Sequence, residues 1–429
     1  MLCCPGVRAQ VSFSGSSEKV INIRPEASTG LNAIYVVYDT EGVTADYTSK
    51  GGKVTWMRYG NLGGGYAQEI AFDTDGTVTS VALGSEDSGY IVEDGTDRYY
   101  FWVVNYANHH AGFESLHFAE DQECDRARLE LSGSAGRIPY YTITGVPKDL
   151  SRELVVEYRT LKYNESTMAY DQVSASQTFD YIDQTIGVFA PLCDTRFTLT
   201  GDRFLKEWGR GIEAETSTYS AIAVEAHTSG EQEQRDADNE QSVEGGTFGG
   251  SAPAYVQFTA AVTDAAIFRE WQLSHDPEFE VIFDRFRQLD FDYTFRENGN
   301  TYVRFVANNA DGTCEYVGDT YDVVIGESDL LCPNAFSPNG DGVNDEWKVS
   351  YKSIVDFECH IFNRWGQEMA HLTNPAQGWD GKYKGKVVPT GAYFYVIKAR
   401  GADGRKYNLS GDINIIKAEK GSATTPSAE

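Results

Sequence analysis

The chain has 429 residues and a formal net charge of −28 at pH 7. This charge excludes a nucleic-acid-binding protein, because it offers no excess of cations to neutralise phosphates. No apolar run approaches the roughly 20 residues that a membrane-spanning helix needs, so we expect a chain that does not span a membrane. With 26 Tyr, 22 Phe and 42 Gly against 4 Met, the composition favours strands and tight turns, in about three to five domains.

The first residues are typical of the end of a secretory signal peptide. Val7-Arg8-Ala9 places small residues at the −3 and −1 positions of a cleavage site, so we expect Gln10 to begin the mature chain. An ordinary frayed N-terminus is the alternative. Residues 1–9 are therefore predicted to be a signal peptide remnant.

The next segments predict short sandwiches. Residues 10–120 are expected to form an immunoglobulin-like β-sandwich and residues 121–191 a second β-sandwich. Two segments begin alike, with Cys124-Asp and Cys193-Asp each followed by an alternating strand and a glycine turn. The segments that start at Tyr90 and at Tyr293 also resemble each other, and each is expected near the end of a sandwich unit. Together these similarities indicate weak internal repetition of one sandwich unit.

Residues 192–250 are predicted to be a β-rich segment followed by an acidic linker. The run from Glu231 to Glu240 has almost no apolar content, so we expect a solvated loop or hinge. Whether the residues from Cys193 to Thr228 form a separate small domain or the first strands of the next one stays open at this point.

Residues 251–328 combine a strand with Trp271, an Asp311-Gly312 turn and an alternating strand around Tyr302. These features are similar to the PKD-like immunoglobulin family, and the resemblance implies a sandwich with Trp271 in its core.

The region 329–419 carries the most specific motifs of the chain. It contains a loop from Asn334 to Trp347 that is rich in Asn, Asp, Gly and Pro, then Asn363-Arg-Trp365-Gly366, then Gly378-Trp379-Asp380-Gly381, and then a strand that starts at Gly391. Alternating residues on short strands predict a small antiparallel sandwich.

In their residues and their order these motifs resemble the gliding motility-associated C-terminal domain, the type B sorting domain of the type IX secretion system. The resemblance implies that the type IX secretion machinery recognises this domain. It implies sorting-motif roles for six residues, namely Trp365, Gly366, Trp379, Asp380, Gly381 and Gly391. Residues 420–429 are expected to form a flexible tail.

The loop also offers closely spaced oxygen atoms, from Asn339, Asp341, Asn344 and Asp345. Oxygen ligands are what Ca²⁺ requires, yet the spacing differs from that of an EF-hand. A network of Asx-turns is the favoured interpretation, and calcium is the alternative. No other cofactor is expected.

Five cysteines remain after the signal peptide, so at least one thiol has no partner within the chain. The predicted disulfides are Cys332–Cys359, inside the terminal domain, and Cys193–Cys314, which requires both residues to belong to one folding unit. No partner is assigned to Cys124.

The sequence contains no recognisable nucleophile or metal motif, and no catalytic residue is assigned. Asp73-Thr-Asp75-Gly76 predicts a hairpin turn, and His109, His110 and His117 are expected to be solvated loop residues. The strand from Tyr99 to Val104 is expected to be buried; an exposed aromatic platform for sugar rings is the alternative.

The sequence thus predicts an all-β protein of tandem immunoglobulin-like sandwiches without enzymatic activity. The resemblance implies passage through the periplasm and outer membrane to the cell surface or the medium. The upstream sandwiches are expected to be spacers or adhesive modules for a glycan or protein ligand. The alternative is a surface glycan-binding or glycan-degrading protein.

Overall fold

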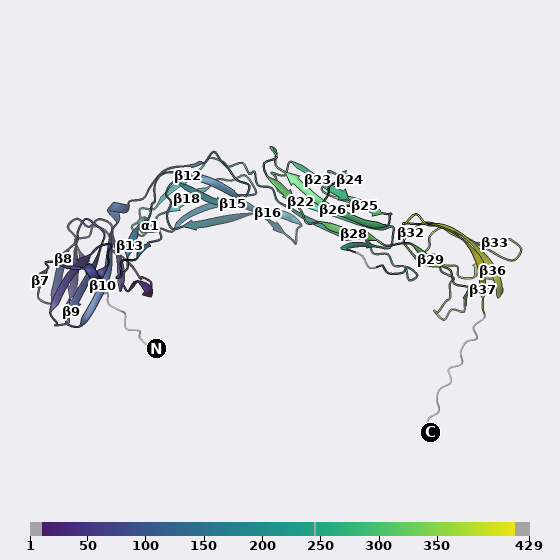
Figure 1. The fold of residues 1–429 in the computed structure, drawn as a ribbon, viewed down its shortest axis with the longest axis horizontal. Helices are drawn as coiled ribbons and strands as arrows, with labels where there is room; N and C mark the ends of the chain where they lie inside the picture. Colours follow the sequence, from purple (N-terminus) through teal and green to yellow (C-terminus); the bar gives the residue numbers. More distant parts are fainter. Residues whose placement is uncertain (1–10, 244–245, 417–429) are drawn as a thin grey trace, which may run out of the picture. The chain divides into compact units, whose positions relative to one another are not determined.

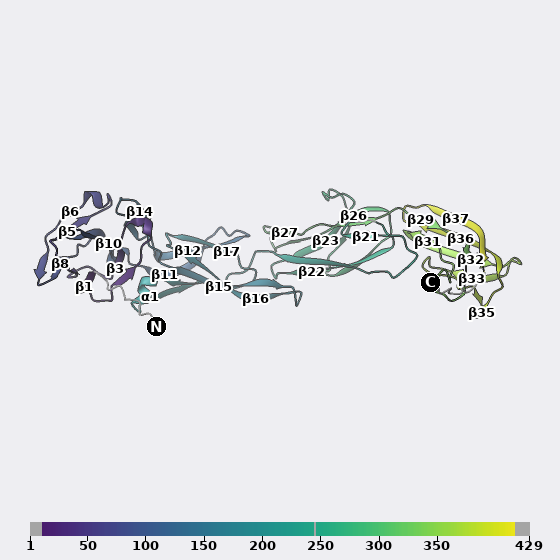
Figure 2. The ribbon, with the colours of Figure 1, turned by 90° about the horizontal axis from the view of Figure 1, so that it is seen from below.

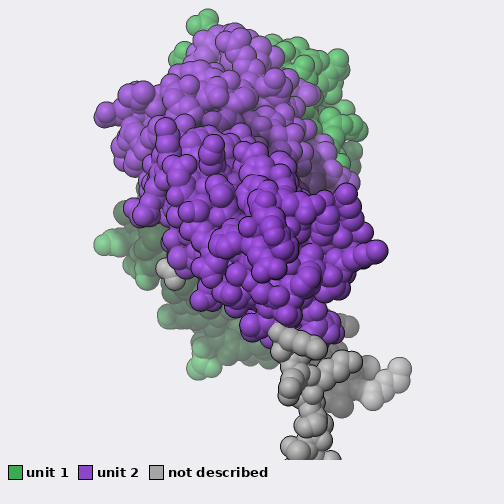
Figure 3. Space-filling model, turned by 90° about the vertical axis from the view of Figure 1, so that its right-hand side faces the viewer, with its two compact units in different colours: residues 1–162, 171–223 green, residues 163–170, 224–429 purple. Residues whose placement is uncertain are grey.

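The structure is a computed structural model that describes residues 11–243 and 246–416. Strands dominate it, which confirms the all-β prediction. The chain divides into two compact units, coloured separately in Figure 3: residues 1–162 with 171–223, and residues 163–170 with 224–429. The predicted signal peptide remnant and C-terminal tail lie outside the described residues.

The first sandwich is built from a four-stranded and a six-stranded sheet (Figure 1). Their strand orders are β1-β4-β8-β7 and β2-β3-β10-β9-β5-β6. The strands are β1 (Val11–Ser14), β2 (Ile21–Ile23), β3 (Ala33–Val37), β4 (Thr44–Thr48), β5 (Val54–Tyr59), β6 (Gln68–Glu69), β7 (Asp73–Asp75), β8 (Val78–Ala82), β9 (Ser88–Asp94) and β10 (Asp97–Asn105). Short 3₁₀ helices cover Ala27–Thr29, Gly64–Tyr66 and Tyr106–His109. Its core includes Tyr47, Trp56 and Phe101.

The second sandwich extends beyond the predicted boundary at residue 191. Its strands are β11 (Gly112–Phe118), β12 (Arg126–Ser134), β13 (Pro139–Tyr141), β14 (Pro147–Asp149), β15 (Leu154–Asn164), β16 (Ala169–Phe179), β17 (Thr185–Phe189), β18 (Thr198–Gly201) and β19 (Ile212–Glu215), with the short helix α1 (Arg203–Glu207). Because β18 pairs with β15, the residues after Cys193 complete this sandwich. The strands after Cys193 are therefore neither a separate small domain nor the first strands of the next unit, the two alternatives that the sequence left open.

The first and second sandwiches share one hydrophobic core. Trp102 of β10 and Phe204 of α1 belong to the same buried cluster, together with residues of β12 and β15. Trp208, at the end of α1, donates from Nε1 to the carbonyl of Lys19 at 2.7 Å. These two domains are therefore packed against each other.

The third sandwich begins earlier than residue 251. Its sheets are ordered β20-β22-β25 and β21-β28-β26-β23-β24, with β27 paired to β26. The strands are β20 (Ala226–Gln232), β21 (Phe248–Gly250), β22 (Ala254–Val262), β23 (Phe268–Ser274), β24 (Ile282–Phe286), β25 (Phe291–Phe295), β26 (Gly299–Asn308), β27 (Glu315–Val317) and β28 (Tyr321–Ile325). Trp271 lies fully buried at its centre, as the sequence predicted.

The terminal sandwich has a main sheet ordered β30-β37-β36-β32-β33 (Figure 2). Its strands are β29 (Asp329–Leu331), β30 (Ala335–Phe336), β31 (Ser350–Lys352), β32 (Ile354–Phe362), β33 (Glu368–Leu372), β34 (Lys382–Tyr383), β35 (Lys386–Val387), β36 (Gly391–Gly401) and β37 (Lys406–Ile415). On β36, Tyr393 and Ile397 are buried while Phe394 and Val396 are exposed. This is the alternation that the sequence predicted for this strand.

The acidic run from Glu231 to Glu240 is not a free hinge. Its first two residues end β20, which pairs with β22. Further along, Asn239 donates from Nδ2 to the carbonyls of Val349 and Pro375 at 2.7 and 2.8 Å. The main-chain carbonyl of Asn239 also accepts from the amide of Tyr351, so the end of this run is bound to the terminal sandwich, which its polar composition alone did not reveal.

Candidate functional site

The terminal sandwich is organised around two of its motif tryptophans. Trp347 and Trp379 are both buried and pair through reciprocal main-chain hydrogen bonds of 2.9 and 3.0 Å. Trp347 also donates from Nε1 to the carbonyl of Pro333 at 2.7 Å. The Trp379 ring packs edge-on against Tyr393 of β36. These two indoles therefore hold the motif loops against the main sheet.

The third motif tryptophan lies on the surface. Trp365 is 75% exposed in the turn between β32 and β33, where the Asn363 side chain accepts hydrogen bonds from the amides of Trp365 and Gln367. The guanidinium of Arg364 lies 4.3 Å from the centroid of the Trp365 ring. Gly366 has a φ of 77°, which a residue with a side chain rarely adopts. The turn thus presents a large aromatic side chain to solvent.

The remaining sorting-motif residues shape a second turn. Asp380 accepts hydrogen bonds from the amide and the Nζ of Lys382, at 3.0 and 2.7 Å. The Lys382 side chain is the main reason that the pKa of Asp380 lies below its usual range. Gly381 has a φ of 68°, and a Cβ there would approach Pro338 within 3.0 Å. Gly391, with a φ of 139°, opens β36. These residues have structural roles in the domain.

The oxygen-rich loop is closed by hydrogen bonds within its own chain. The Asp345 carboxylate accepts from the amides of Asn339, Gly340 and Gly342 at 2.9, 2.6 and 2.7 Å. Asp341 accepts from the amide of Val343 at 2.9 Å and from the Asn339 side chain at 2.8 Å. Asn344 has a φ of 51°. This geometry has the features of the Asx-turn interpretation, and calcium binding by these residues stays a prediction.

The structure corrects the predicted disulfides. Cys193, Cys332 and Cys359 are free thiols, whereas Cys314 is disulfide-bonded, so neither the Cys193–Cys314 nor the Cys332–Cys359 bond is formed. Cys359 points into the core from β32, and burial raises its pKa to about 12. Burial also raises the pKa of Cys332, whose thiol interacts with the Tyr395 hydroxyl. Sequence position suggested proximity but could not orient the two Cβ–Sγ bonds.

The aromatic strand does not form a binding platform. Trp102 is 1% exposed and packs against Tyr59 and Tyr141 at ring-centroid distances of 5.8 and 5.6 Å. Phe101, on the opposite face of β10, is fully buried in the core between the two sheets. Burial on both faces confirms the interpretation of this strand as a central strand.

Two other predicted features differ in outcome. Asp73–Asp75 forms β7, which pairs with β8 across a tight turn, so the hairpin prediction is confirmed. His109 is not a solvated loop residue, because its Nε2 lies 2.6 Å from Oδ2 of Asp87 and its side chain is only 17% exposed. His110 is exposed, as expected, whereas His117 is exposed but lies on β11 and not in a loop.

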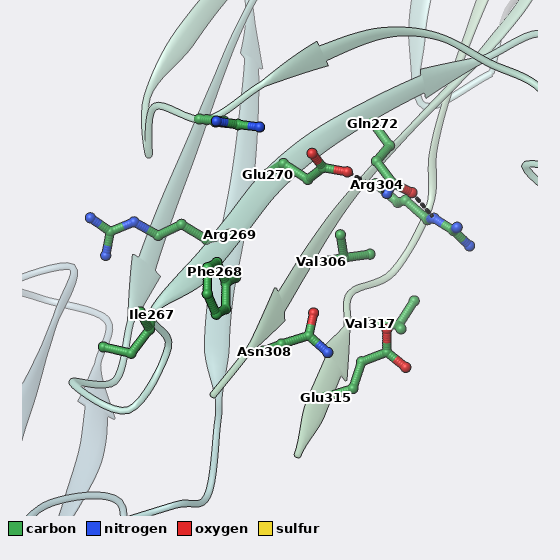
Figure 4. A pocket seen from close by; sticks show the side chains of 11 residues that line it. Ile267, Phe268, Arg269, Glu270, Gln272, Arg304, Val306, Asn308, Glu315 and Val317 are labelled. Carbon is green, nitrogen blue, oxygen red and sulfur yellow. Dashed lines mark hydrogen bonds between the residues drawn. The ribbon is translucent and has the colours of Figure 1, made fainter. Parts of the chain in front are cut away.

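A shallow groove on the third sandwich escaped sequence reasoning. It lies on the outer face of β23, β26 and β27, with a volume of about 550 Å³ (Figure 4). Its rim exposes Ile267, Phe268 and Val317. Glu270 accepts a hydrogen bond from Gln272, which in turn accepts one from Arg304. Outward-facing apolar residues next to charged ones were the available signal, but only the strand pairing brings them together.

Fold and motifs together define a multi-domain protein of β-sandwich modules. Residues 330–415 match the family described as the CHU_C type IX secretion signal domain. Residues 117–217 match the fibronectin type III domain family. The terminal sandwich is thus a type IX secretion signal domain, as its motifs indicated, and a fibronectin type III domain lies upstream of it. A signal domain of this family implies export to the cell surface or secretion.

No curated protein matches this chain significantly. Among solved structures, a tetra-tandem repeat in the extending region of a large adhesion protein shares 12% identity over 89% of this chain and 97% of that one, with a TM-score of 0.23. Fibronectin(III)-like modules of CbhA from Clostridium thermocellum share 10% identity over 46% of this chain and 100% of theirs, with a TM-score of 0.18. Dimeric latent PorU from Porphyromonas gingivalis shares 9% identity over 75% of this chain and 35% of that one, with a TM-score of 0.16.

Within residues 11–243 and 246–416, no helix has both the length and the apolar character needed to span a membrane.

Proposed function

We propose that the chain is a non-enzymatic surface protein, exported by the type IX secretion machinery and displayed or released so that its upstream sandwiches serve as spacers and adhesive modules. The observation that carries this proposal is the match of the terminal sandwich to the type IX signal domain. The exposed Trp365 turn supports a recognition role for that part of the domain, since exposed aromatic side chains are favoured anchors at protein interfaces.

Adhesion is best supported by the groove on the third sandwich. Exposed Phe268 and Val317 offer apolar contact area, and Arg269 and Arg304 offer charged donors beside them. Such a mixture of apolar and charged side chains suits the binding of a protein or glycan ligand that is not chemically altered. The Glu270 carboxylate forms an ion pair with Arg285 and accepts a hydrogen bond from Gln272. These interactions argue against a pair of catalytic glycosidase carboxylates at this place.

Export is tested by removing residues 329–429 and fractionating the cells. The proposal expects the truncated chain to remain in the periplasm while the full chain reaches the surface or medium. Because the third sandwich contacts the terminal one, a second arm fuses residues 329–429 to an unrelated folded reporter. Surface delivery of the truncated chain, or periplasmic retention of the fusion while the full chain is exported, contradicts the proposal.

Adhesion is tested separately, by adherence of cells that display the full chain or its Phe268→Ser/Val317→Ser variant to immobilised glycans and matrix proteins. The variant is expected to reach the surface normally and to adhere less. Equal adherence at equal display contradicts an adhesive role for the groove. The matched control is Phe283→Ser, which removes an exposed aromatic residue from β24, outside the groove.

A further inference from the structure

Two of the seven histidines lie side by side on the outer face of the terminal sheet. His360 of β32 and His371 of β33 are directly opposite in the antiparallel register, and their rings stack with centroids 4.3 Å apart. Glu358 precedes His360 by two residues, so it shares the same face of β32. The residues between and beside them on that strand, Cys359 and Phe357, point into the core. The strand register therefore gathers three metal-binding side chains at one place.

The candidate ligand atoms of this cluster are separated by distances similar to those between ligand atoms around one metal ion. Oε1 of Glu358 lies 3.4 Å from Nε2 of His360 and 3.2 Å from Nε2 of His371. One ligand atom from each of the three residues falls within 4.8 Å of the others. Tetrahedral Zn²⁺ with bonds of about 2.0–2.1 Å to nitrogen or oxygen holds neighbouring ligand atoms about 3.3 Å apart. The two distances from Glu358 already have this value.

The surroundings favour a cation at this place. Oε1 of Glu368 lies 3.4 Å from Nδ1 of His360, the position from which a carboxylate orients a metal-bound imidazole. With neutral imidazoles, Glu358 and Glu368 leave two negative charges, and Lys398, opposite Glu358 on β36, offsets one of them. The side chains of His360 and His371 are 32% and 41% exposed, so solvent can reach the site.

We propose that Glu358, His360 and His371 form a binding site for a divalent transition metal of the Zn²⁺ class. Two imidazoles and one carboxylate suit Zn²⁺, Co²⁺ or Cu²⁺, whereas Ca²⁺ and Mg²⁺ prefer all-oxygen ligands. The stacked rings must turn toward Glu358 to bring both nitrogen atoms onto one ion, a rotation that exposed side chains allow. Three protein ligands leave a fourth position for water or an external donor. This site is separate from the export function.

The test is Zn²⁺ titration of the tag-free full chain by calorimetry after removal of metals with a chelator. We expect one ion per chain at this site, and Co²⁺ substitution should give the intense visible absorption of a tetrahedral complex. The His360→Ala/His371→Ala variant should lose the Co²⁺ spectrum, and its Zn²⁺ affinity should fall at least tenfold. Glu358→Gln should weaken binding with the sheet intact, which circular dichroism checks.

Two controls separate this site from other sources of metal affinity. His275→Ala removes an exposed imidazole outside the cluster and should leave binding unchanged. Cys332→Ser/Cys359→Ser removes the thiols of the same domain and should also leave it unchanged. Unaltered Zn²⁺ affinity in the double histidine variant overturns the proposal. So does loss of binding in the cysteine variant when circular dichroism shows that its sheet is intact.

Discussion

Arg152 and Asp202 form an ion pair whose side chains are 2% and 0% exposed, at the junction between the first two sandwiches. The guanidinium also donates from Nε to the carbonyl of Gly136 and from Nη2 to that of His109, both at 2.6 Å. The Asp202 carboxylate caps α1 by accepting from the amides of Phe204 and Leu205 at 2.7 and 3.2 Å. One buried pair thus connects the His109 turn, the second sandwich and its only α-helix among the described residues.

Replacing Arg152 with Met should destabilise the first unit strongly. The substitution leaves the buried Asp202 carboxylate without its counter-charge, which typically costs about 3–5 kcal/mol. Hydrogen exchange measured by mass spectrometry reports the peptides of each unit separately, and those of residues 100–219 should lose protection. The matched control is Arg196→Met, which breaks an exposed ion pair with Glu215 and should cost less than about 1 kcal/mol. Equal effects of the two substitutions would contradict this account.

The motif tryptophans should separate into stabilising and exposed roles. Trp379→Ala removes a buried indole and should lower the unfolding free energy of the terminal sandwich by about 3–5 kcal/mol. Trp365→Ala changes a residue that is 75% exposed, so its stability effect should stay within about 0.5 kcal/mol. Denaturant unfolding, followed by the fluorescence of the remaining tryptophans, measures the difference.

The same two variants test recognition when export is followed in cells. If the Trp365 turn contacts the export machinery, Trp365→Ala should reduce surface delivery although the domain stays folded. Normal export of this variant would assign recognition to another face of the terminal sandwich. Arg364→Ala is the neighbouring control, because it removes the cation that lies over the indole without removing the indole itself.

Asp345 should make the terminal sandwich sensitive to acid. Hydrogen bonds from backbone amides hold the pKa of this carboxyl below its usual value, with the amide of Gly340 contributing most. Because the folded pKa lies below the ordinary value of about 3.9, the stabilisation is complete above that pH and is lost as pH falls through the folded pKa. The difference in Tm between the protein and Asp345→Asn should therefore be largest at neutral pH and should disappear in acid.

A difference in Tm that does not change with pH would contradict this assignment for Asp345. Asp356→Asn is the matched control, since this carboxylate bonds the Arg400 side chain instead of main-chain amides. Repeating the measurement with Ca²⁺ tests the calcium prediction for the same loop. Ca²⁺ should raise the Tm of the protein, and not that of Asp345→Asn, only if the loop binds the ion.

Asn239 should couple the third sandwich to the terminal one. Its side chain bonds two carbonyls of the terminal sandwich, and its own carbonyl accepts from the amide of Tyr351 at 3.1 Å. Asn239→Ala leaves the carbonyls of Val349 and Pro375 without this donor, at a cost of about 1–3 kcal/mol. Calorimetry should show the transitions of the two sandwiches moving apart. Asn300→Ala, an exposed residue of β26 in the third sandwich, should leave them unchanged.

The all-β fold and the terminal domain could be predicted from the sequence because their signals are local. Alternation along the strand from Gly391 assigns its two faces, and Asn, Asp, Gly and Pro specify turns through their own backbone preferences. The Asp73–Gly76 hairpin and the burial of Trp271 followed from the same short-range patterns. The resemblance to a sorting domain rests on the order of the motifs along the chain, which requires no knowledge of long-range contacts.

Tertiary structure alone decided which distant segments pair. The strand after Cys193, which the sequence left unassigned, joins the second sandwich through β15. The acidic run before Glu240 contacts the terminal domain, although its composition suggested a loop or hinge. Trp365 and Trp379 look equivalent in sequence, yet one is exposed and the other buried. Only the strand register places His360 and His371 opposite each other. Register, side-chain direction and domain contacts depend on the packing of whole sheets, which no short stretch of sequence specifies.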